Sequence, residues 1–244
     1  MFLKKWLRLL RRKKRAARLG FEFKRSAGFI LPPHIQVQGK PLKLSYPQEV
    51  GTINDFLTIF LDDDYRLELH QWEVSTVLDI GANLGFFSVA ARNAFPDAKI
   101  HAYEPNQKLS THLRIHASQA NFDVHYEAVG LADGHVSLDF RGDTNQTRSQ
   151  IDVEGDVPQV AFRKAVERLG GQVDFAKIDC EGAEWEFLQD EEPWQKVNFL
   201  AMEYHLWPGT KTHYDIHIAL RKLGFQVLRL KPIEDYGLVY AMRL

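Results

Sequence analysis

The sequence predicts an α/β fold: a mostly parallel sheet with helices on both faces. From Ser75 onward, short apolar runs alternate with segments of helical periodicity, which is typical of such a sheet. The last two apolar runs, 225–231 and 237–244, lie too close together for a crossover helix, so we expect an antiparallel hairpin there. A chain of 244 residues with 45% hydrophobic side chains is long enough to bury a large core.

The elements of this sheet are expected in a regular order along the chain. Apolar runs predict strands at 75–80, 98–104, 122–129, 173–179 and 197–205, with an additional hairpin strand at 135–140. Helical spacing of apolar residues predicts helices at 83–95, 106–120, 159–169, 182–190 and 214–224. The polar stretch 141–150 is expected to be a loop.

Three segments are expected. The main domain spans 71–244, and 21–70 forms a lead-in of short strands and a helix. Residues 1–20 form a basic amphipathic tail, in which 1–18 carry nine Lys and Arg and no acidic residue. The rest of the chain has 22 basic and 32 acidic residues, a net charge of about −10.

The tail has helical amphipathic spacing. Apolar side chains such as Trp6 and Leu10 fall on one arc of a helix and most basic side chains on the other. Such a helix suits the surface of an anionic membrane leaflet. A solvated basic tail and a nucleic-acid contact are the alternatives. The acidic body disfavours nucleic acid as a partner.

Composition bounds the chemistry and the compartment. The single cysteine, Cys180, excludes an internal disulfide and is compatible with a reducing compartment. We therefore expect a cytoplasmic protein, held on the inner face of the membrane if its tail binds lipid. The ten histidines show no metal-ligand spacing, so no metal is expected. No apolar run approaches the roughly 20 residues of a membrane span.

The segment "DIGANLG", from Asp79 to Gly85, sits where the first strand of the main domain gives way to a helix. Two glycines there are explained either by a tight turn or by a ligand lying against bare backbone. The dinucleotide fingerprint G-x-G-x-x-G is absent. Ligands of such sheets bind beyond the carboxyl ends of the strands, where Asp79 is placed to accept hydrogen bonds. Glu104 ends the next strand and can accept both hydroxyls of a ribose, which suggests a nucleoside-like ligand.

These residues carry a family resemblance. Across roughly 75–205, the stretches "VLDIGANLGFFSVAAR", "AYEPN", "EAVG", "AKIDCEGAEWEFL" and "MEYH" occur in that order. In them the chain resembles the FkbM family of the class I S-adenosylmethionine-dependent methyltransferases, which have a Rossmann-like fold. The resemblance implies S-adenosyl-L-methionine as the cofactor. The residues it implies for cofactor binding are Asp79, Gly81, Ala82, Asn83, Gly85, Glu104, Pro105, Asn106, Ala128 and Val129.

A second group of polar residues lies at the same edge of the expected sheet. Asp179 ends one strand, Glu181 opens the helix after it, and His205 ends the next strand. Methyl transfer to a hydroxyl needs in-line placement of the oxygen and removal of a proton. Each of these three residues is therefore a candidate catalytic base. Glu203, two residues before His205, is placed to orient its imidazole.

Three functions are weighed. The first is an O-methyltransferase acting on a hydroxyl of a sugar, glycan precursor or polyketide-like metabolite, as the resemblance implies. The second is a nucleic-acid methyltransferase that uses the basic tail as an electrostatic arm. The third is a non-catalytic module that binds S-adenosylmethionine, which the intact Asp79, Glu104 and Asp179 disfavour.

Overall fold

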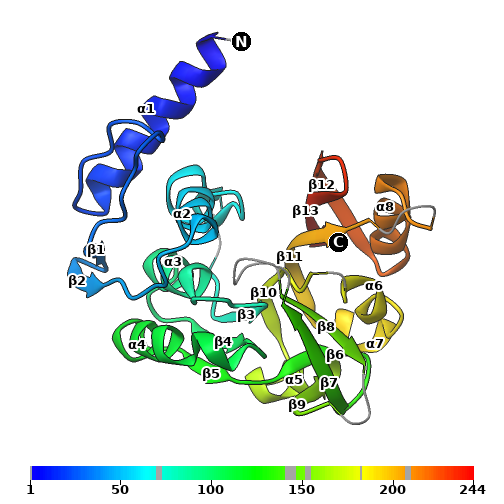
Figure 1. Cartoon of the computed structure of the whole chain (residues 1–244). Helices are drawn as coiled ribbons and strands as arrows, with labels where there is room; N and C mark the ends of the chain where they lie inside the picture. The colour runs from blue at the N-terminus through cyan, green and yellow to red at the C-terminus, as the bar shows by residue number, and fades with distance from the viewer. Residues whose placement is uncertain (1, 70–72, 141–146, 152–154, 182, 207–209) are drawn as a thin grey trace.

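A seven-stranded sheet in the order β12-β13-β11-β10-β3-β4-β5 forms the centre of the molecule (Figure 1). The computed structural model describes residues 1–244 except 1, 70–72, 141–146, 152–154, 182 and 207–209. The strands of this sheet are β3 (Thr76–Ile80), β4 (Lys99–Tyr103), β5 (Asp123–His125), β10 (Val173–Ile178), β11 (Val197–His205), β12 (Phe225–Pro232) and β13 (Tyr236–Arg243). Neighbouring strands from β5 to β11 pair in parallel, and β13 runs antiparallel to β11 and β12. The predicted fold class and the predicted C-terminal hairpin are confirmed.

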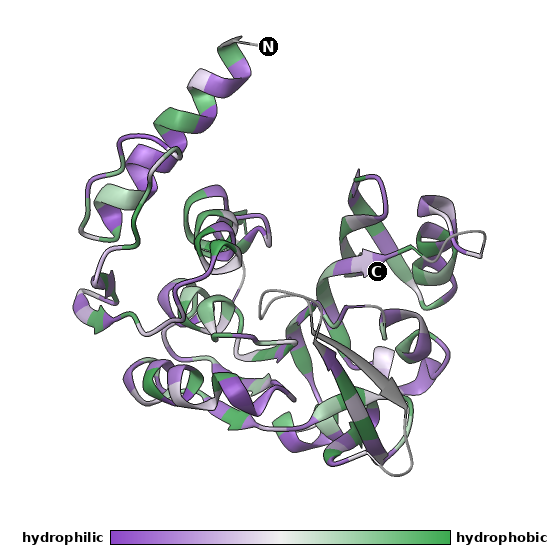
Figure 2. Ribbon diagram, in the orientation of Figure 1, coloured by the Kyte–Doolittle hydropathy of each residue, from purple (hydrophilic) through white to green (hydrophobic). Residues whose placement is uncertain are grey.

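Helices cover both faces of the sheet and divide the core in two. α3 (Phe86–Ala94) and α4 (Ser110–Ala120) pack on the face that carries Val77 and Phe175. α5 (Phe162–Leu169) and α8 (His213–Lys222) pack on the face that carries Leu78 and Ala176. Because side chains alternate along a strand, neighbouring residues serve opposite cores. Figure 2 shows the resulting concentration of hydrophobic residues on the strands of the central sheet.

Several predicted helices differ in extent from the observed ones. The helix predicted at 83–95 begins at Phe86, because Gly85 before it takes a left-handed φ of 77°. The helix predicted at 106–120 is a short 3₁₀ turn, η3 (Gln107–Leu109), followed by α4. In place of the helix predicted at 182–190 there are two short helices, α6 (Glu184–Phe187) and α7 (Glu191–Trp194).

A second sheet has the order β6-β9-β7-β8, and the sequence predicts only its strand at 135–140. Its strands are β6 (Ala128–Gly130), β7 (Gly134–Phe140), β8 (Thr147–Ile151) and β9 (Val157–Ala161). The single strand predicted at 122–129 is wrong, because its two ends belong to different sheets. Of the loop predicted at 141–150, residues 141–146 lie outside the described residues, and residues 147–150 belong to β8. The helix predicted at 159–169 begins only at Phe162, since β9 pairs with both β6 and β7, and this pairing overrides local helix preference.

The lead-in segment contains short strands and helices before the main sheet begins. β1 (His34–Val37) and β2 (Lys40–Lys43) form an antiparallel hairpin. Then α2 (Val50–Phe56) runs directly into a π-helix, η1 (Leu57–Asp62), and a 3₁₀ turn, η2 (Leu67–Leu69), follows. The π-helix ends at Asp62, and the residue after it, Asp63, has a left-handed φ of 54°. The division of the chain into three segments stays a prediction.

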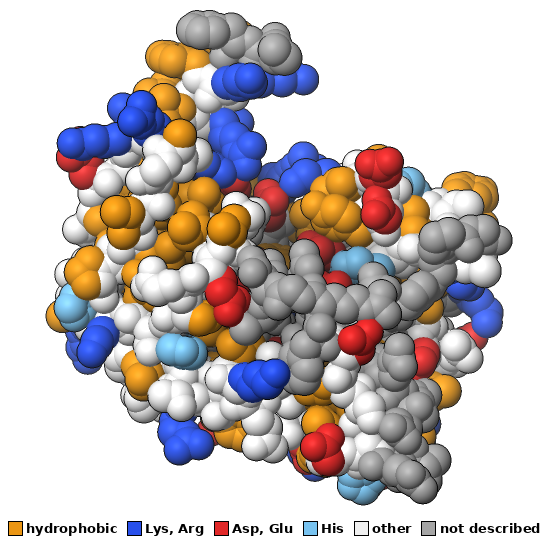
Figure 3. Space-filling view, in the orientation of Figure 1, with side chains coloured by type: hydrophobic (Ala, Val, Ile, Leu, Met, Phe, Trp, Pro, Cys, Tyr) orange, Lys and Arg blue, Asp and Glu red, His pale blue; other side chains and the backbone are white. Residues whose placement is uncertain are grey.

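The basic N-terminus forms a helix, α1 (Phe2–Arg18), whose second half is fixed to the lead-in segment. Arg8 and Arg12 both donate to Asp62, with Nη2–Oδ2 distances of 2.5 Å, and Arg15 donates to Glu68. Burial by itself raises the pKa of Asp62, but the two guanidinium groups lower it to about 2. Figure 3 shows Lys and Arg side chains gathered along this helix. Among the described residues, no helix is both long and apolar enough to cross a membrane.

Candidate functional site

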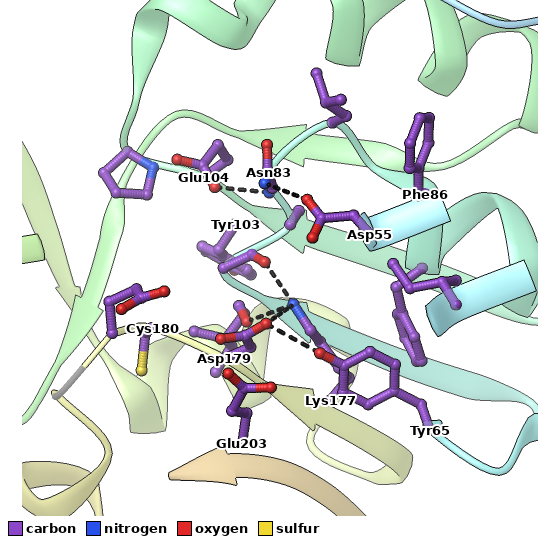
Figure 4. Close-up of a pocket in the computed structure, with 18 of the residues that line it drawn as sticks. Asp55, Tyr65, Asn83, Phe86, Tyr103, Glu104, Lys177, Asp179, Cys180 and Glu203 are labelled. Carbon is purple, nitrogen blue, oxygen red and sulfur yellow. Dashed lines mark hydrogen bonds and ion pairs between the residues drawn. The ribbon is translucent and has the colours of Figure 1, made fainter. Parts of the chain in front are cut away.

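A cavity of about 340 Å³ lies at the carboxyl ends of β3, β4 and β10 (Figure 4). Ligands of open α/β sheets bind at this edge, and the volume lies within the usual range for small-molecule sites. One group of labelled residues in Figure 4 comprises Glu104, Asn83 and Asp55. The other group is formed by Asp179, Lys177, Glu203 and Tyr65. The cavity therefore has two polar regions.

The glycines of the turn after β3 are required by contacts within the chain. A Cβ on Gly81 would lie 1.7 Å from the carbonyl oxygen of Asp179. A Cβ on Gly85 would lie 2.7 Å from Leu113 Cδ1 of α4. Both residues also have a left-handed φ, which glycine adopts without strain. These two glycines thus allow the turn to pack closely against Asp179 and against α4. A larger residue at either position would disturb the fold before it met a ligand.

The predicted cofactor residues of this turn divide between cavity and interior. Gly81, Ala82 and Asn83 line the cavity, and Gly85 does not. Asp79 is also absent from the lining and is fully buried. Its Oδ2 accepts a hydrogen bond of 2.7 Å from Ser88 of α3, and its Oδ1 lies 3.3 Å from the ammonium group of Lys177. Asp79 therefore lies behind the cavity wall, where it holds in place the turn and Lys177, a residue of that wall.

Glu104, at the end of β4, lines the cavity with a carboxylate held by two backbone amides. Its Oε2 accepts from the amide of Asn83 at 2.7 Å, and its Oε1 accepts from the amide of Asn106 at 2.8 Å. Burial raises its pKa to about 7, although both hydrogen bonds act in the opposite direction. Each oxygen keeps a second lone pair for a ligand hydroxyl. Pro105, Ala128 and Val129 also line the cavity, whereas Asn106 is buried behind it.

Asp179 follows β10 and lines the second polar region of the cavity. Its Oδ2 accepts a hydrogen bond of 2.9 Å from the hydroxyl of Tyr65. The same oxygen lies 3.9 Å from the ammonium nitrogen of Lys177. Burial by itself lowers the pKa of Lys177, but the charges of Asp79 and Asp179 raise it above its ordinary value. Lys177 is therefore a fixed cation beneath Asp179.

The other two candidate bases, Glu181 and His205, differ in their access to the cavity. Glu181 lines it, and His205 does not. The His205 Nδ1 lies 3.1 Å from Glu184, and its Nε2 lies 3.5 Å from Glu181 and 3.7 Å from Glu203. Burial opposes protonation of His205, but the hydrogen bond to Glu184 and the charges of Glu184, Glu181 and Asp179 raise its pKa to about 9. An imidazole that already holds its proton at neutral pH does not fit the predicted role of a base.

Four residues of the two polar regions are among the cavity-lining residues that the sequence did not predict as site residues. Lys177 could have been predicted from the sequence. It lies in an apolar strand two positions before Asp179, so the two side chains share a face. Glu203 was singled out only as a partner of His205, yet it lines the cavity. Tyr65 and Asp55 come from the lead-in segment, where no pattern relates them to the strand ends. Asp55 accepts a hydrogen bond of 3.2 Å from the side-chain amide of Asn83.

Comparison with known proteins assigns the chain to a family. The methyltransferase FkbM domain matches residues 79–227, more than half of the chain. The chain belongs to the FkbM methyltransferase family. Two similar proteins are methyltransferase sdnD of Sordaria araneosa and methyltransferase 1 of Beauveria bassiana. The first is 25% identical, covering 63% of this chain and 74% of its own. The second is 24% identical, covering 59% of this chain and 70% of its own.

Solved structures resemble the chain more distantly. The crystal structure of precorrin-6y C5,15-methyltransferase from Geobacter metallireducens is 12% identical, with a TM-score of 0.49. The match covers 82% of this chain and 93% of that one. Fibrillarin from Aeropyrum pernix, solved with natively bound S-adenosyl-L-methionine, is also 12% identical, with a TM-score of 0.46, and the match covers 70% and 67% of the two chains.

The FkbM family uses S-adenosyl-L-methionine, and the cavity residues of this chain fit that cofactor. The remaining lone pairs of Glu104 suit the two hydroxyls of a ribose. Ala128 and Val129 offer an apolar wall to an adenine. When bound, S-adenosyl-L-methionine supplies an electrophilic methyl group attached to a cationic sulfur. The carboxylates at this cavity suit a ligand with that charge.

Proposed function

We propose that this FkbM methyltransferase methylates a hydroxyl of a sugar, glycan precursor or polyketide-like metabolite. The observation that carries the proposal is Asp179. Its carboxylate lines the cavity, and Tyr65 and Lys177 hold it in place from below. A carboxylate fixed beside an acceptor hydroxyl can orient that hydroxyl and remove its proton.

The proposed reaction assigns distinct tasks to the two polar regions. Glu104 would hold the ribose of the cofactor. Asp179 would orient the acceptor hydroxyl and take its proton, and the bound cofactor would supply the methyl group that the hydroxyl oxygen receives and would leave as a neutral thioether. Glu181 and Glu203, which also line the cavity, accept hydrogen bonds from further hydroxyls of the acceptor. A ring with several hydroxyls satisfies more of these acceptors than a single alcohol does.

The test is transfer of a labelled methyl group from S-adenosyl-L-methionine into a pool of glycans and metabolites. The wild-type protein is expected to label a hydroxyl compound, and the Asp179→Asn variant is expected to label it at least about a hundredfold more slowly. Labelling of amines or nucleic acid instead would overturn the proposal. Calorimetric binding of S-adenosyl-L-methionine without methyl transfer to any compound of the pool would point to the non-catalytic module.

We also propose that α1 attaches the protein to the anionic inner face of the cytoplasmic membrane. Its apolar stripe is solvent-exposed, with Leu3 at 65%, Trp6 at 48% and Leu10 at 42%. A nucleic-acid contact has less support, because several of the basic side chains already bind acidic residues of the lead-in segment. Arg8, Arg12, Arg15 and Arg18 all take part in such pairs.

A further inference from the structure

A second cavity, of about 250 Å³, opens beside the candidate active site and is mostly apolar. Phe175 of β10 and Tyr240 of β13 are buried at its base. Leu69 and Leu228 also line it, and their side chains are 59% and 52% exposed. Apolar side chains that border a hollow and remain open to water gain free energy when an apolar group fills that hollow.

Tyr65 lies in the wall that the second cavity shares with the first. It lines both cavities, and its hydroxyl is the group that binds Asp179. The residue that binds Asp179 in the first cavity is therefore also part of the apolar cavity. The first cavity presents carboxylates that can bind the polar part of an amphiphilic molecule. The second presents apolar side chains that can bind its hydrocarbon part.

The charged residues of the second cavity narrow the choice of occupant. Arg66 and Arg229 both line it, and the Arg66 guanidinium lies 5.7 Å from the ring centre of Tyr240. These groups disfavour a cationic tail. They also disfavour a second copy of the chain, because a symmetric pairing through this face would bring four guanidinium groups together.

We infer that the second cavity holds the hydrocarbon chain of an amphiphilic acceptor, a sugar or polyol joined to an acyl or isoprenoid chain. The inference rests on the proposed function and narrows its substrate class. The head of the acceptor lies at Asp179, and its chain crosses Tyr65 and lies between Leu69 and Leu228. An acceptor of this kind resides in a membrane, so attachment of α1 to the membrane would bring the enzyme to its substrate.

The test uses the full chain and a series of alkyl β-glucosides from methyl to decyl, each below its micelle concentration, titrated by calorimetry. Affinity is expected to rise about threefold to fourfold per added methylene until the cavity is full, since each buried methylene is worth ~0.8 kcal/mol. In the Leu228→Gln variant this dependence on chain length is expected to weaken markedly. The matched control is Ile30→Gln, at a residue that is 82% exposed and does not line the cavity.

The comparison of these two variants separates the cavity from α1, which is also able to bind alkyl chains. Equal chain-length dependence in Leu228→Gln and Ile30→Gln would overturn the inference. A dimer in sedimentation velocity that Leu228→Gln dissociates would overturn it too, by making this face an interface between copies.

Methyl transfer to the same glucosides distinguishes the inference from the function on which it rests. Transfer with equal kcat/KM for methyl and decyl glucosides would leave the proposed function intact and refute the inference. Chain binding that depends on Leu228, without methyl transfer to any hydroxyl compound, would refute the proposed function and support the apolar cavity as a binding site.

Discussion

The hydroxyl of Tyr65 donates a hydrogen bond of 2.9 Å to Asp179, although the two residues are 114 positions apart in the chain. Tyr65 belongs to the lead-in segment, and Asp179 belongs to the sheet. This partly buried hydrogen bond means that the segment before the sheet contributes to the candidate active site.

Replacing Tyr65 by Phe is expected to lower kcat by about tenfold to a hundredfold, because a hydrogen bond to a charged group contributes ~1.5–3 kcal/mol. Cofactor affinity, measured by calorimetry, is expected to stay near the wild-type value. The matched control is Tyr126→Phe, which removes a hydroxyl that donates to the backbone of Ser110. Equal turnover in both variants would show that the hydroxyl of Tyr65 does not position Asp179.

Replacing Asp179 by Asn preserves the shape of the side chain and removes its charge. Turnover is expected to fall by about a hundredfold or more, with little change in cofactor affinity. His205→Gln serves as the comparison, since the imidazole of His205 is held protonated and lies outside the cavity lining. A large loss in His205→Gln together with normal turnover in Asp179→Asn would move the base to His205. Full activity in both would leave proton removal to solvent.

Affinity for S-adenosyl-L-methionine is expected to rise between pH 6 and pH 8. Burial raises the pKa of Glu104 to about 7, so below that value one of its oxygens carries a proton and loses acceptor capacity. In Glu104→Gln the affinity is expected to be about fivefold to a hundredfold weaker, an effect of ~1–3 kcal/mol, and to lose this pH dependence. The exposed control Glu22→Gln is expected to behave as wild type. An unchanged pH profile in Glu104→Gln would rule out its role on the ribose.

The free energy of unfolding is expected to contain a contribution from His205 that disappears as the pH rises from 6.5 to 9. The folded protein holds the His205 proton up to a pKa of about 9, whereas the unfolded chain releases it near 6.5. The stabilisation is thus complete below pH 6.5 and absent above 9, with a size on the order of 1–3 kcal/mol. Denaturant titrations of wild type and His205→Gln test it. Parallel curves across this window would contradict the assignment.

Binding to vesicles of anionic lipid at low salt is expected to fall in the double variant Leu3→Gln, Trp6→Gln. Both side chains are exposed, so the substitutions leave the core intact. Deleting α1 would be a poorer test, because Asp62 would lose the arginines that neutralise it. Leu131→Gln, at an exposed residue of the main domain, is the control. Equal sedimentation of the double variant and wild type with these vesicles would refute the membrane role of α1.

The sequence carried enough information for the sheet and for the residues at its strand ends. Glu104 and Asp179 were predictable because each follows an apolar strand, and parallel strands present their carboxyl ends at one edge. Tyr65 was not predictable, because its place depends on how the lead-in segment packs against the sheet. The protonation of His205 was hidden for the same reason, since it depends on Glu184 from a separate helix.

The glycines illustrate a different limit. The sequence allows two explanations for Gly81, a tight turn or backbone kept bare for a ligand, and the structure shows that the carbonyl of Asp179 occupies the space that a Cβ would need. A Gly81→Val variant would therefore test the packing of two strands as much as the binding of a cofactor. A sequence reveals that a position must lack a side chain, but it does not reveal what lies against it.

β13 follows both β11 and β12 along the chain, yet it lies between them in the sheet. While the chain is being synthesised, β11 and β12 are therefore both present with the edges that β13 will later cover still unpaired. Open strand edges of this kind pair readily with other chains. A chain that stops before Tyr236 would lack the strand between β11 and β12 and would leave an edge of each unpaired, so such a truncation is expected to aggregate.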